Sequence, residues 1–227
     1  MADSEIPKSA LDVAAIHTSS LLRDLGRQHA FIGGYAALLL GGNRSVNNVD
    51  IIIDVDPETI QKDLIQAGSG SIFPFNKKFF RFEVFDSGFT VNVIIKLFHG
   101  GSGSSISQYR LPHPSVAPLI VPRVMSTDIP VIHPSVLIST KVKRWKSIAA
   151  STRPETAEQA TRDIVDIEII LQWLEASNMG VSFKTYPEKS TRELLDAFSE
   201  LHAKGGDTIR TLMRATMPGR TWVIENA

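Results

Sequence analysis

Apolar and polar positions follow two periods along this chain, one typical of helices and one typical of strands. In the first half, apolar residues recur at helical spacing over residues 9–28, and Ser9 with Asp12 predicts a capping arrangement at the start of that helix. Short runs rich in β-branched or aromatic residues, bounded by glycine, predict strands. The predicted elements are a helix at 9–28, a strand at 29–32, a helix at 34–40, a strand at 49–55, a helix from 57 to about 66, and strands at 79–85, 89–97 and within 116–124.

The second half follows the helical period alone. Helices are predicted at residues 134–148, 155–177 and 190–204, the last opened by a capping box from Ser190 to Glu193. The pattern therefore indicates an α/β (α+β) core over residues 1–130, with a mixed sheet flanked by helices. A helical C-terminal domain follows over residues 131–227.

Composition narrows the classes of function. The chain has 227 residues, and its 24 Lys and Arg balance its 24 Asp and Glu, which argues against general nucleic-acid binding. It has no cysteine, so thiolate catalysis, disulfides and cysteine metal sites are excluded. No apolar run approaches the length of a membrane span and no secretory signal is evident, so a cytoplasmic protein without membrane association is expected.

One segment carries candidate chemistry. Gly33 and Gly34 follow a predicted strand and open a short apolar helix, where backbone N–H groups can approach a phosphate. Asn48 and Asp50 lie two residues apart on the next strand, so their side chains share one face. A glycine pair followed by paired acids on a strand suits binding of a triphosphate and two metal ions, but here one of the expected acids is an asparagine.

These residues resemble the signature of the nucleotidyltransferase superfamily that includes DNA polymerase β, and most closely its small bacterial-type and toxin-like members. The resemblance is carried by Gly33-Gly34-Tyr35-Ala36, Arg44 and Asn48-Val49-Asp50, followed in the expected order by Lys141 and Lys143 on one helix and Arg162-Asp163-Ile164-Val165-Asp166 on the next. It implies a cleft between the core and the C-terminal helices, an NTP and Mg²⁺ as ligands, and a phosphate-binding role for Gly33, Gly34, Arg44, Lys141 and Lys143. A site-organising role is implied for Asp163 and Asp166.

The chain departs from that signature at the metal site. The resemblance implies carboxylates at position 48 and on a later strand, which we align with position 92, but both residues are asparagine. Only Asp50 remains, so weak Mg²⁺ binding is expected. Three interpretations stay open: a degenerate natural site, a fold redirected to metal-free chemistry, or engineered asparagines. Glu83 is a substitute acid to consider, and His99 a metal-free acid or base.

The leading hypothesis is a nucleotidyltransferase-fold protein that binds a nucleotide or a related small molecule, with impaired or altered transfer at Asp50, Asn48 and Asn92. The alternative is a metal-free isomerase, cyclase or lyase of a biosynthetic pathway built on the same fold. A third hypothesis is a non-catalytic binding or regulatory protein.

Overall fold

The computed structural model describes residues 5–76, 79–86, 89–101, 111–184, 186, 191–217 and 219. Its elements, in chain order, are α1 (Lys8–Asp24), β1 (His29–Ile32), α2 (Gly33–Leu39), β2 (Asn48–Ile53), α3 (Pro57–Ala67), β3 (Ile72–Pro74), β4 (Phe79–Asp86), β5 (Phe89–His99), β6 (Leu119–Ile120), β7 (Arg123–Val124), β8 (Thr127–Asp128), β9 (Val131–Ile132), α4 (Pro134–Ile148), α5 (Pro154–Ala176), α6 (Thr191–Lys204) and α7 (Asp207–Thr216). The predicted α/β class is confirmed.

A mixed sheet of seven strands forms the centre, in the order β3-β4-β5-β2-β1-β9-β6. The pair β1–β2 is antiparallel, whereas β2–β5 and β1–β9 are parallel. Strand β2 lies in the middle and its residues Ile51, Ile52 and Ile53 are fully buried. The β-branched run that predicted a buried strand is therefore a central strand, as that composition favours.

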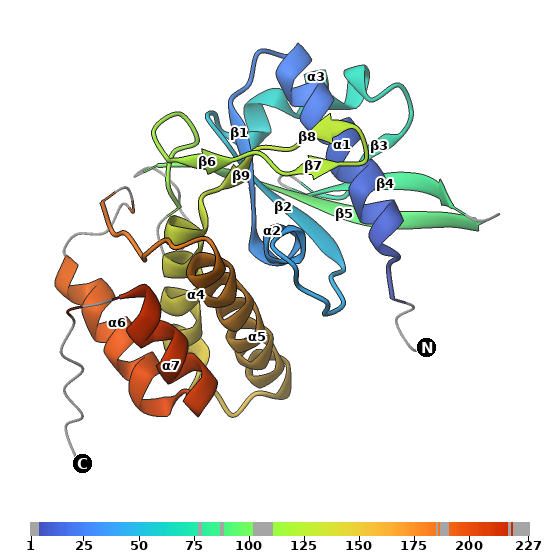
Figure 1. Ribbon diagram of the computed structural model, residues 1–227. Coiled ribbons are helices and arrows are strands. Elements are labelled where there is room, and N and C mark those ends of the chain that lie inside the picture. Colours follow the sequence, from blue (N-terminus) through green and yellow to red (C-terminus); the bar gives the residue numbers. More distant parts are fainter. Residues whose placement is uncertain are drawn as a thin grey trace.

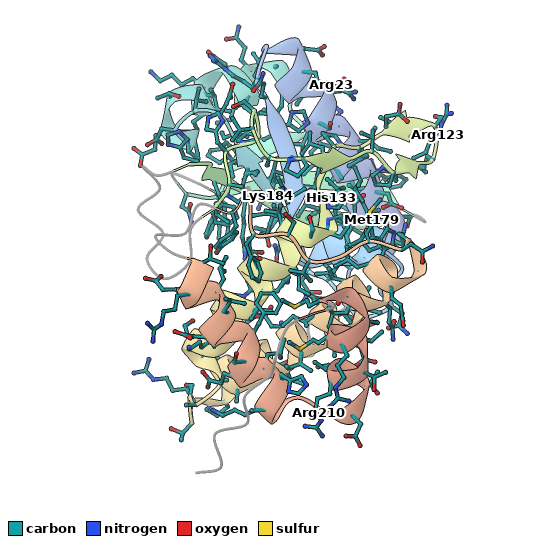
Figure 2. All side chains as sticks on the ribbon, turned by 60° about the vertical axis from the view of Figure 1, so that its left-hand side comes forward. Arg23, Arg123, His133, Met179, Lys184 and Arg210 are labelled. Carbon is teal, nitrogen blue, oxygen red and sulfur yellow. The ribbon has the colours of Figure 1, made fainter. Side chains whose placement is uncertain are left out.

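Helices cover the sheet in two groups (Figure 1). Helix α1 packs on β2, β4 and β5, and helix α3 on β3 and β5, while α4–α7 form a separate layer in which α4 and α5 lie against one another. Helix α2 contacts β1, β2 and α5, and so stands between the sheet and the helical layer. One apolar core runs through both layers, and charged side chains such as Arg23 and Arg123 lie on the outer surface (Figure 2).

The helical layer begins at Pro134, directly after β9, which belongs to the sheet. The division into domains at residue 130 remains a prediction. No helix in the described part of the chain combines the length and apolar character needed to cross a bilayer.

The strand expected within 116–124 is present as two separate two-residue strands, β6 and β7, broken at Pro122. Another local prediction was wrong. Asp12 does not cap α1: Pro7 stands at the N-cap position without a side-chain hydrogen bond. Instead the Asp12 carboxylate is buried and accepts hydrogen bonds from Tyr35 Oη at 2.9 Å and Lys8 Nζ at 2.7 Å. The capping residue predicted for α6, Ser190, lies outside the described residues.

Candidate functional site

The glycine pair lies at the β1–α2 junction, as the sequence predicted. Gly33 has φ of +72°, a conformation that L side chains rarely adopt, and a Cβ atom there would collide with the carboxylate of Asp50. A Cβ atom on Gly34 would lie 2.5 Å from Nη2 of Arg44. Both glycines are therefore required because two charged side chains pack directly on the backbone.

Asn48 and Asp50 share one face of β2, and Asn48 Nδ2 donates a hydrogen bond of 2.5 Å to Asp50 Oδ1. Both side chains are half-buried. The first two positions of the predicted triad are thus together. Asn48 acts as a donor to the acid rather than as a second negative ligand.

Asn92 does not join them. In the parallel pairing of β2 with β5, Asn48 stands opposite Ile94 and Asp50 stands opposite Lys96. Asn92 lies further back along β5, exposed and paired with Glu83 of β4. The expected convergence of Asn48, Asp50 and Asn92 was therefore wrong, and the residue facing Asp50 from β5 is a lysine.

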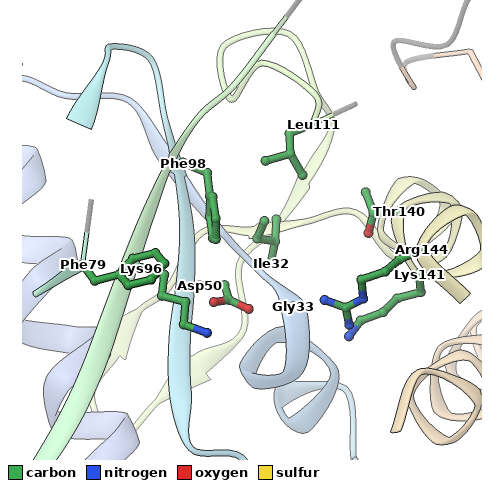
Figure 3. Close-up of a pocket in the computed structure, with 10 residues that line it drawn as sticks. All are labelled: Ile32, Gly33, Asp50, Phe79, Lys96, Phe98, Leu111, Thr140, Lys141 and Arg144. Carbon is green, nitrogen blue, oxygen red and sulfur yellow. The ribbon is translucent and has the colours of Figure 1, made fainter. Parts of the chain in front are cut away.

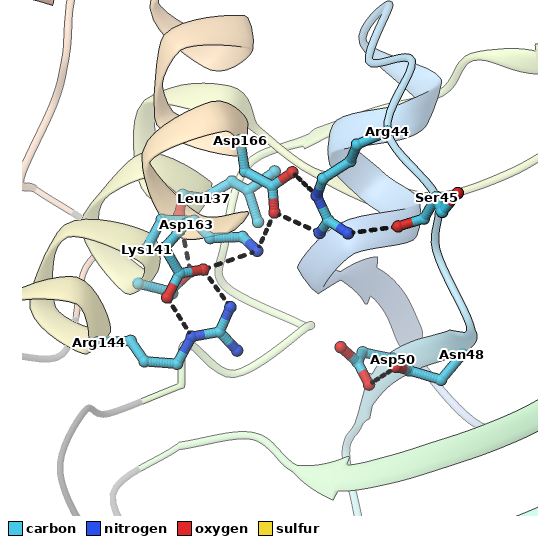
Figure 4. Close-up of polar contacts among 10 residues, drawn as sticks. Arg44, Ser45, Asn48, Asp50, Leu137, Lys141, Arg144, Asp163 and Asp166 are labelled. Atoms are coloured by element: carbon cyan, nitrogen blue, oxygen red, sulfur yellow. Dashed lines mark hydrogen bonds and ion pairs between the residues drawn. The ribbon is translucent and has the colours of Figure 1, made fainter. Parts of the chain in front are cut away.

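A network of five charged residues joins the sheet layer to the helical layer (Figure 4). Arg44 donates two hydrogen bonds to Asp166, from Nε at 2.6 Å and from Nη2 at 2.7 Å. Lys141 Nζ lies 2.5 Å from Asp166 and 3.4 Å from Asp163. Arg144 completes the set with two hydrogen bonds to Asp163, one of them from Nε at 2.7 Å.

Helical spacing explains this network. Asp163 and Asp166 stand three residues apart on α5, and Lys141 and Arg144 three apart on α4, so each pair shares one helix face. The side chains of Lys141, Asp163 and Asp166 are almost fully buried, at 2%, 0% and 3% exposure. Charges buried to this degree persist only when they are paired, which here they are.

The remaining candidates lie elsewhere. Lys143 points to α6, where its Nζ is 3.7 Å from Glu193. Arg162 forms an exposed pair with Glu158 on α5. Glu83 lies 3.3 Å from Arg81, and His99 stands opposite Ile53 at the far end of β5. None of these four residues lines the pocket that contains Asp50.

That pocket has a volume of about 180 Å³ (Figure 3). Its lining combines charged and polar groups with an apolar wall, and consists of Ile32, Gly33, Asp50, Phe79, Lys96, Phe98, Leu111, Thr140, Lys141 and Arg144. It lies between β1, β2 and β5 on one side and α4 on the other, which is the cleft that the resemblance implies.

The two central carboxylates are perturbed in opposite directions. Desolvation raises the pKa of Asp50, although the charges of Lys96, Lys141, Arg144 and Arg44 oppose that shift. For Asp166, desolvation is outweighed by the hydrogen bonds and charges of Arg44 and Lys141, which lower its pKa. The charged form of Asp166 is therefore stabilised, whereas burial destabilises the charged form of Asp50.

The donor set at Asp50 does not fit a magnesium site. Among the described residues, no group of three His, Cys, Asp or Glu side chains is placed to hold a metal ion. Mg²⁺ is bound through oxygen ligands, chiefly carboxylates, whereas Asp50 is joined here by one amide and faced by the Lys96 ammonium. A cation beside the single acid weakens the attraction for a second cation.

Sequence reasoning missed Lys96 and Arg144 as pocket residues. Lys96 carried a usable signal: it is the lone charge in the apolar run from Val91 to Phe98. Arg144 had one as well, since it follows Lys141 by three residues on the same predicted helix.

Comparison with solved structures finds one protein that is similar over nearly its whole length and others that are less similar. The crystal structure of an antigenic nucleotidyltransferase-like protein from Paracoccidioides brasiliensis is similar with a TM-score of 0.71 and 15% identity, covering 94% of this chain and 96% of that one. The solution structure of the antibiotic-resistance factor ANT(2'')-Ia gives 0.46 and 9%, covering 75% and 92%. The lincosamide antibiotic adenylyltransferase LnuA, with lincomycin bound, gives 0.37 and 12%, covering 70% and 98%.

The first of these likenesses spans nearly both chains and shows the fold: this chain has a nucleotidyltransferase-like fold, as its motifs predicted. No family model and no curated protein sequence matches it.

Proposed function

We propose that the cleft binds a small anionic ligand, a nucleotide or a related molecule, without metal-dependent nucleotidyl transfer. The observation that carries this proposal is the position of Lys96 opposite Asp50, at the point where β5 faces the acid of β2. Two-metal transfer needs negative side chains around both ions, and this cleft presents a positive one instead.

Charge balance around the pocket supports the proposal. Arg44, Lys141, Arg144 and Lys96 supply four positive charges, and Asp50, Asp163 and Asp166 supply three negative ones. The single excess positive charge belongs to the network, where Arg44, Lys141 and Arg144 share only two carboxylates, and two of those cations, Lys141 and Arg144, line the pocket. An anion gains from that excess, whereas a divalent cation does not.

Asn48 and Asp50 have a different role in this proposal. The amide holds one oxygen of the Asp50 carboxylate, and Gly33 leaves room for the other. The acid is thus fixed in one orientation and can accept a hydrogen bond from the ligand.

Calorimetry with ATP, GTP, CTP and UTP, in EDTA and again in Mg²⁺, tests the proposal. We expect similar affinity under both conditions, and about tenfold weaker binding for Lys96→Met, which corresponds to about 1.4 kcal/mol. Lys143→Met is the matched control, since Lys143 pairs with Glu193 outside the pocket. Binding that requires Mg²⁺ contradicts the proposal.

A restored metal site provides the converse test. The double variant Asn48→Asp/Lys96→Asp places three carboxylates on adjacent strands and is expected to bind Mg²⁺ and to release pyrophosphate from an NTP faster than the wild type. A wild-type protein that already releases pyrophosphate faster than this variant contradicts the proposal.

The position of Asp50 in the pocket wall, together with its raised pKa, favours a second candidate, a metal-free enzyme that transfers protons, such as an isomerase or lyase. In such an enzyme Asp50 removes a proton from the substrate and returns it at another atom. Incubation with small carboxylic acids in D₂O and EDTA, followed by NMR, is expected to show C–H to C–D exchange that disappears in Asp50→Asn. No exchange in the wild-type protein contradicts this candidate.

A further inference from the structure

The pocket around Asp50 is divided into an apolar side and a charged side. Ile32, Phe98 and Leu111 lie together above Asp50 in Figure 3, while Lys96 lies on one side of the acid and Lys141 with Arg144 on the other. A ligand that fills this space meets both kinds of surface at once. Its polar and apolar parts must therefore lie on different sides of one small molecule.

Lys96 differs from the other cations at the pocket. Lys141 is bound between Asp163 and Asp166, and Arg144 is hydrogen-bonded to Asp163. Lys96 forms no ion pair or hydrogen bond within the described part of the chain, and its Nζ stands 5.6 Å from the centroid of the Phe79 ring. This ammonium is the place for one anionic group of a ligand.

Asp50 limits the charge of that ligand. Its carboxylate faces the same space as Lys96, so a second or third negative charge placed there is repelled. The acid instead suits a hydrogen-bond donor, because an ionised carboxylate only accepts. Lys96 and Asp50 together therefore suit a ligand that carries one anionic group and, close to it, one hydrogen-bond donor.

The volume sets the size of the ligand. The pocket has a volume of about 180 Å³. Pockets that enclose drug-sized ligands are larger, at about 300–1,000 Å³. The space at Asp50 therefore suits a compact molecule or the compact end of a longer one.

We propose that the ligand of this pocket is a compact hydroxy acid. Its single anionic group lies on Lys96, its hydroxyl donates to Asp50, and its short apolar body packs on Ile32, Phe98 and Leu111. This inference rests on the proposed function, because both place an anion on Lys96 without a metal ion. It narrows that function, because repulsion from Asp50 is expected to make a polyphosphate bind more weakly than a ligand with a single negative charge.

Three related probes test each part of the proposal by calorimetry in EDTA. Leucic acid carries the carboxylate, the hydroxyl and a branched apolar body; isocaproic acid lacks the hydroxyl; methyl leucate lacks the negative charge. We expect leucic acid to bind, isocaproic acid to bind about fivefold more weakly, and methyl leucate to bind at least about tenfold more weakly.

Variants assign those differences to residues. In Lys96→Met the advantage of leucic acid over methyl leucate is expected to vanish, and in Asp50→Ala the advantage over isocaproic acid is expected to vanish. Lys143→Met is expected to retain both advantages, because it lies outside the pocket. Should Asp50→Ala fail to fold, Asp50→Asn in the same series reports the loss of the charged acceptor.

The outcomes separate this inference from the proposed function. If ATP binds without Mg²⁺ through Lys96 and leucic acid does not bind, the hydroxy-acid class is wrong and metal-free anion binding stands. If leucic acid binds equally well to the wild type and Lys96→Met, the inference is also wrong. Mg²⁺-dependent release of pyrophosphate by the wild type overturns the proposed function itself.

Discussion

Two groups of charges lie close together in this protein, and they are built in opposite ways. In the network between the layers, Arg44, Lys141 and Arg144 each contact a carboxylate of α5, and the carboxylates are buried. At the pocket, Lys96 and Asp50 face the same space without forming an ion pair. Charges that are buried and paired with one another stabilise the structure, whereas charges that line a cavity without pairing can still bind a ligand.

This difference changes the roles that the sequence motifs suggested. Arg44 and Lys141 belong to the ordered set of residues that carries the resemblance, but in the structure both donate hydrogen bonds to Asp166. They hold α5 against the loop that leads into β2, the strand that carries Asp50. Lys96, which lies outside the motif, is the cation left to meet a ligand.

The largest expected effect comes from breaking the network. Asp166→Ala leaves Arg44 and Lys141 without their shared partner, and an unpaired buried charge costs about 3–5 kcal/mol of the free energy of unfolding. Urea denaturation measures it. Glu158→Gln, which removes only the exposed partner of Arg162, is the control and is expected to change stability by less than about 1 kcal/mol. A loss below about 1 kcal/mol for Asp166→Ala contradicts the structural role.

Much of this contrast was visible in the sequence, and the rest depended on strand register. Local spacing predicts the glycine junction at Gly33, a helix that carries Lys141 and a following helix that carries Asp163 and Asp166; that the two helices face one another is known only from the structure. Asn92 and Lys96 share one face of β5, because they are four residues apart and strand alternation has a period of two. Periodicity alone therefore cannot tell which of them stands beside Asp50.

Long-range pairing was equally hidden. Arg44 and Asp166 are 122 residues apart, and Tyr35 and Asp12 are 23 apart. The capping pattern assigned Asp12 to a helix cap because it considers only residues that are close in the sequence. The buried hydroxyl of Tyr35 needed an acceptor, and that requirement decided where the carboxylate points.

The next effect is expected at the glycine that separates the two groups of charges. Gly33→Ala adds a Cβ atom that collides with Asp50 on a backbone with φ of +72°. Gly26→Ala is a matched control, because Gly26 has φ of +68° and open space around it. In both variants we expect backbone strain to lower the free energy of unfolding by about 1–2 kcal/mol. In Gly33→Ala alone, the collision with Asp50 is expected to lower it by roughly a further 1–3 kcal/mol.

Urea denaturation of both variants gives the difference, and binding of leucic acid shows whether Asp50 has moved. Equal losses of stability in the two variants mean that the Asp50 carboxylate moves away from the added methyl group without an energetic cost. That result contradicts the fixed orientation proposed for this acid.

The pH dependence of stability is expected to separate the two carboxylates. Asp166 has a lowered pKa, so its contribution is present above the ordinary value of 3.8 and is lost as the pH falls below it. Asp50 has a raised pKa, so the folded state gains stability at low pH and loses it as the pH rises from 3.8 through the raised pKa. Each slope is limited to about 1.4 kcal/mol per pH unit.

Denaturation of the wild type, Asp50→Asn and Asp166→Asn from pH 3 to pH 8, roughly, measures both signs. Relative to the wild type, the free energy of unfolding of Asp50→Asn is expected to increase as the pH rises. The loss of stability in Asp166→Asn is expected to become smaller as the pH falls below 3.8. Parallel curves for the two variants contradict the assignment of opposite environments.

The smallest expected effect on stability comes from removing the pocket cation. Lys96→Met retains the aliphatic stem against Phe79 and removes a charge that has no ion pair among the described residues but attracts Asp50, so the free energy of unfolding is expected to fall by less than about 1 kcal/mol. The same substitution at Lys141 removes hydrogen bonds to two buried carboxylates and is expected to cost about 2–3 kcal/mol. Denaturation of both variants, with ligand binding measured on the same samples, gives the comparison. Lys96 is a ligand-binding cation only if its loss weakens binding and leaves stability intact; a loss of stability equal to that of Lys141→Met makes it part of the framework instead.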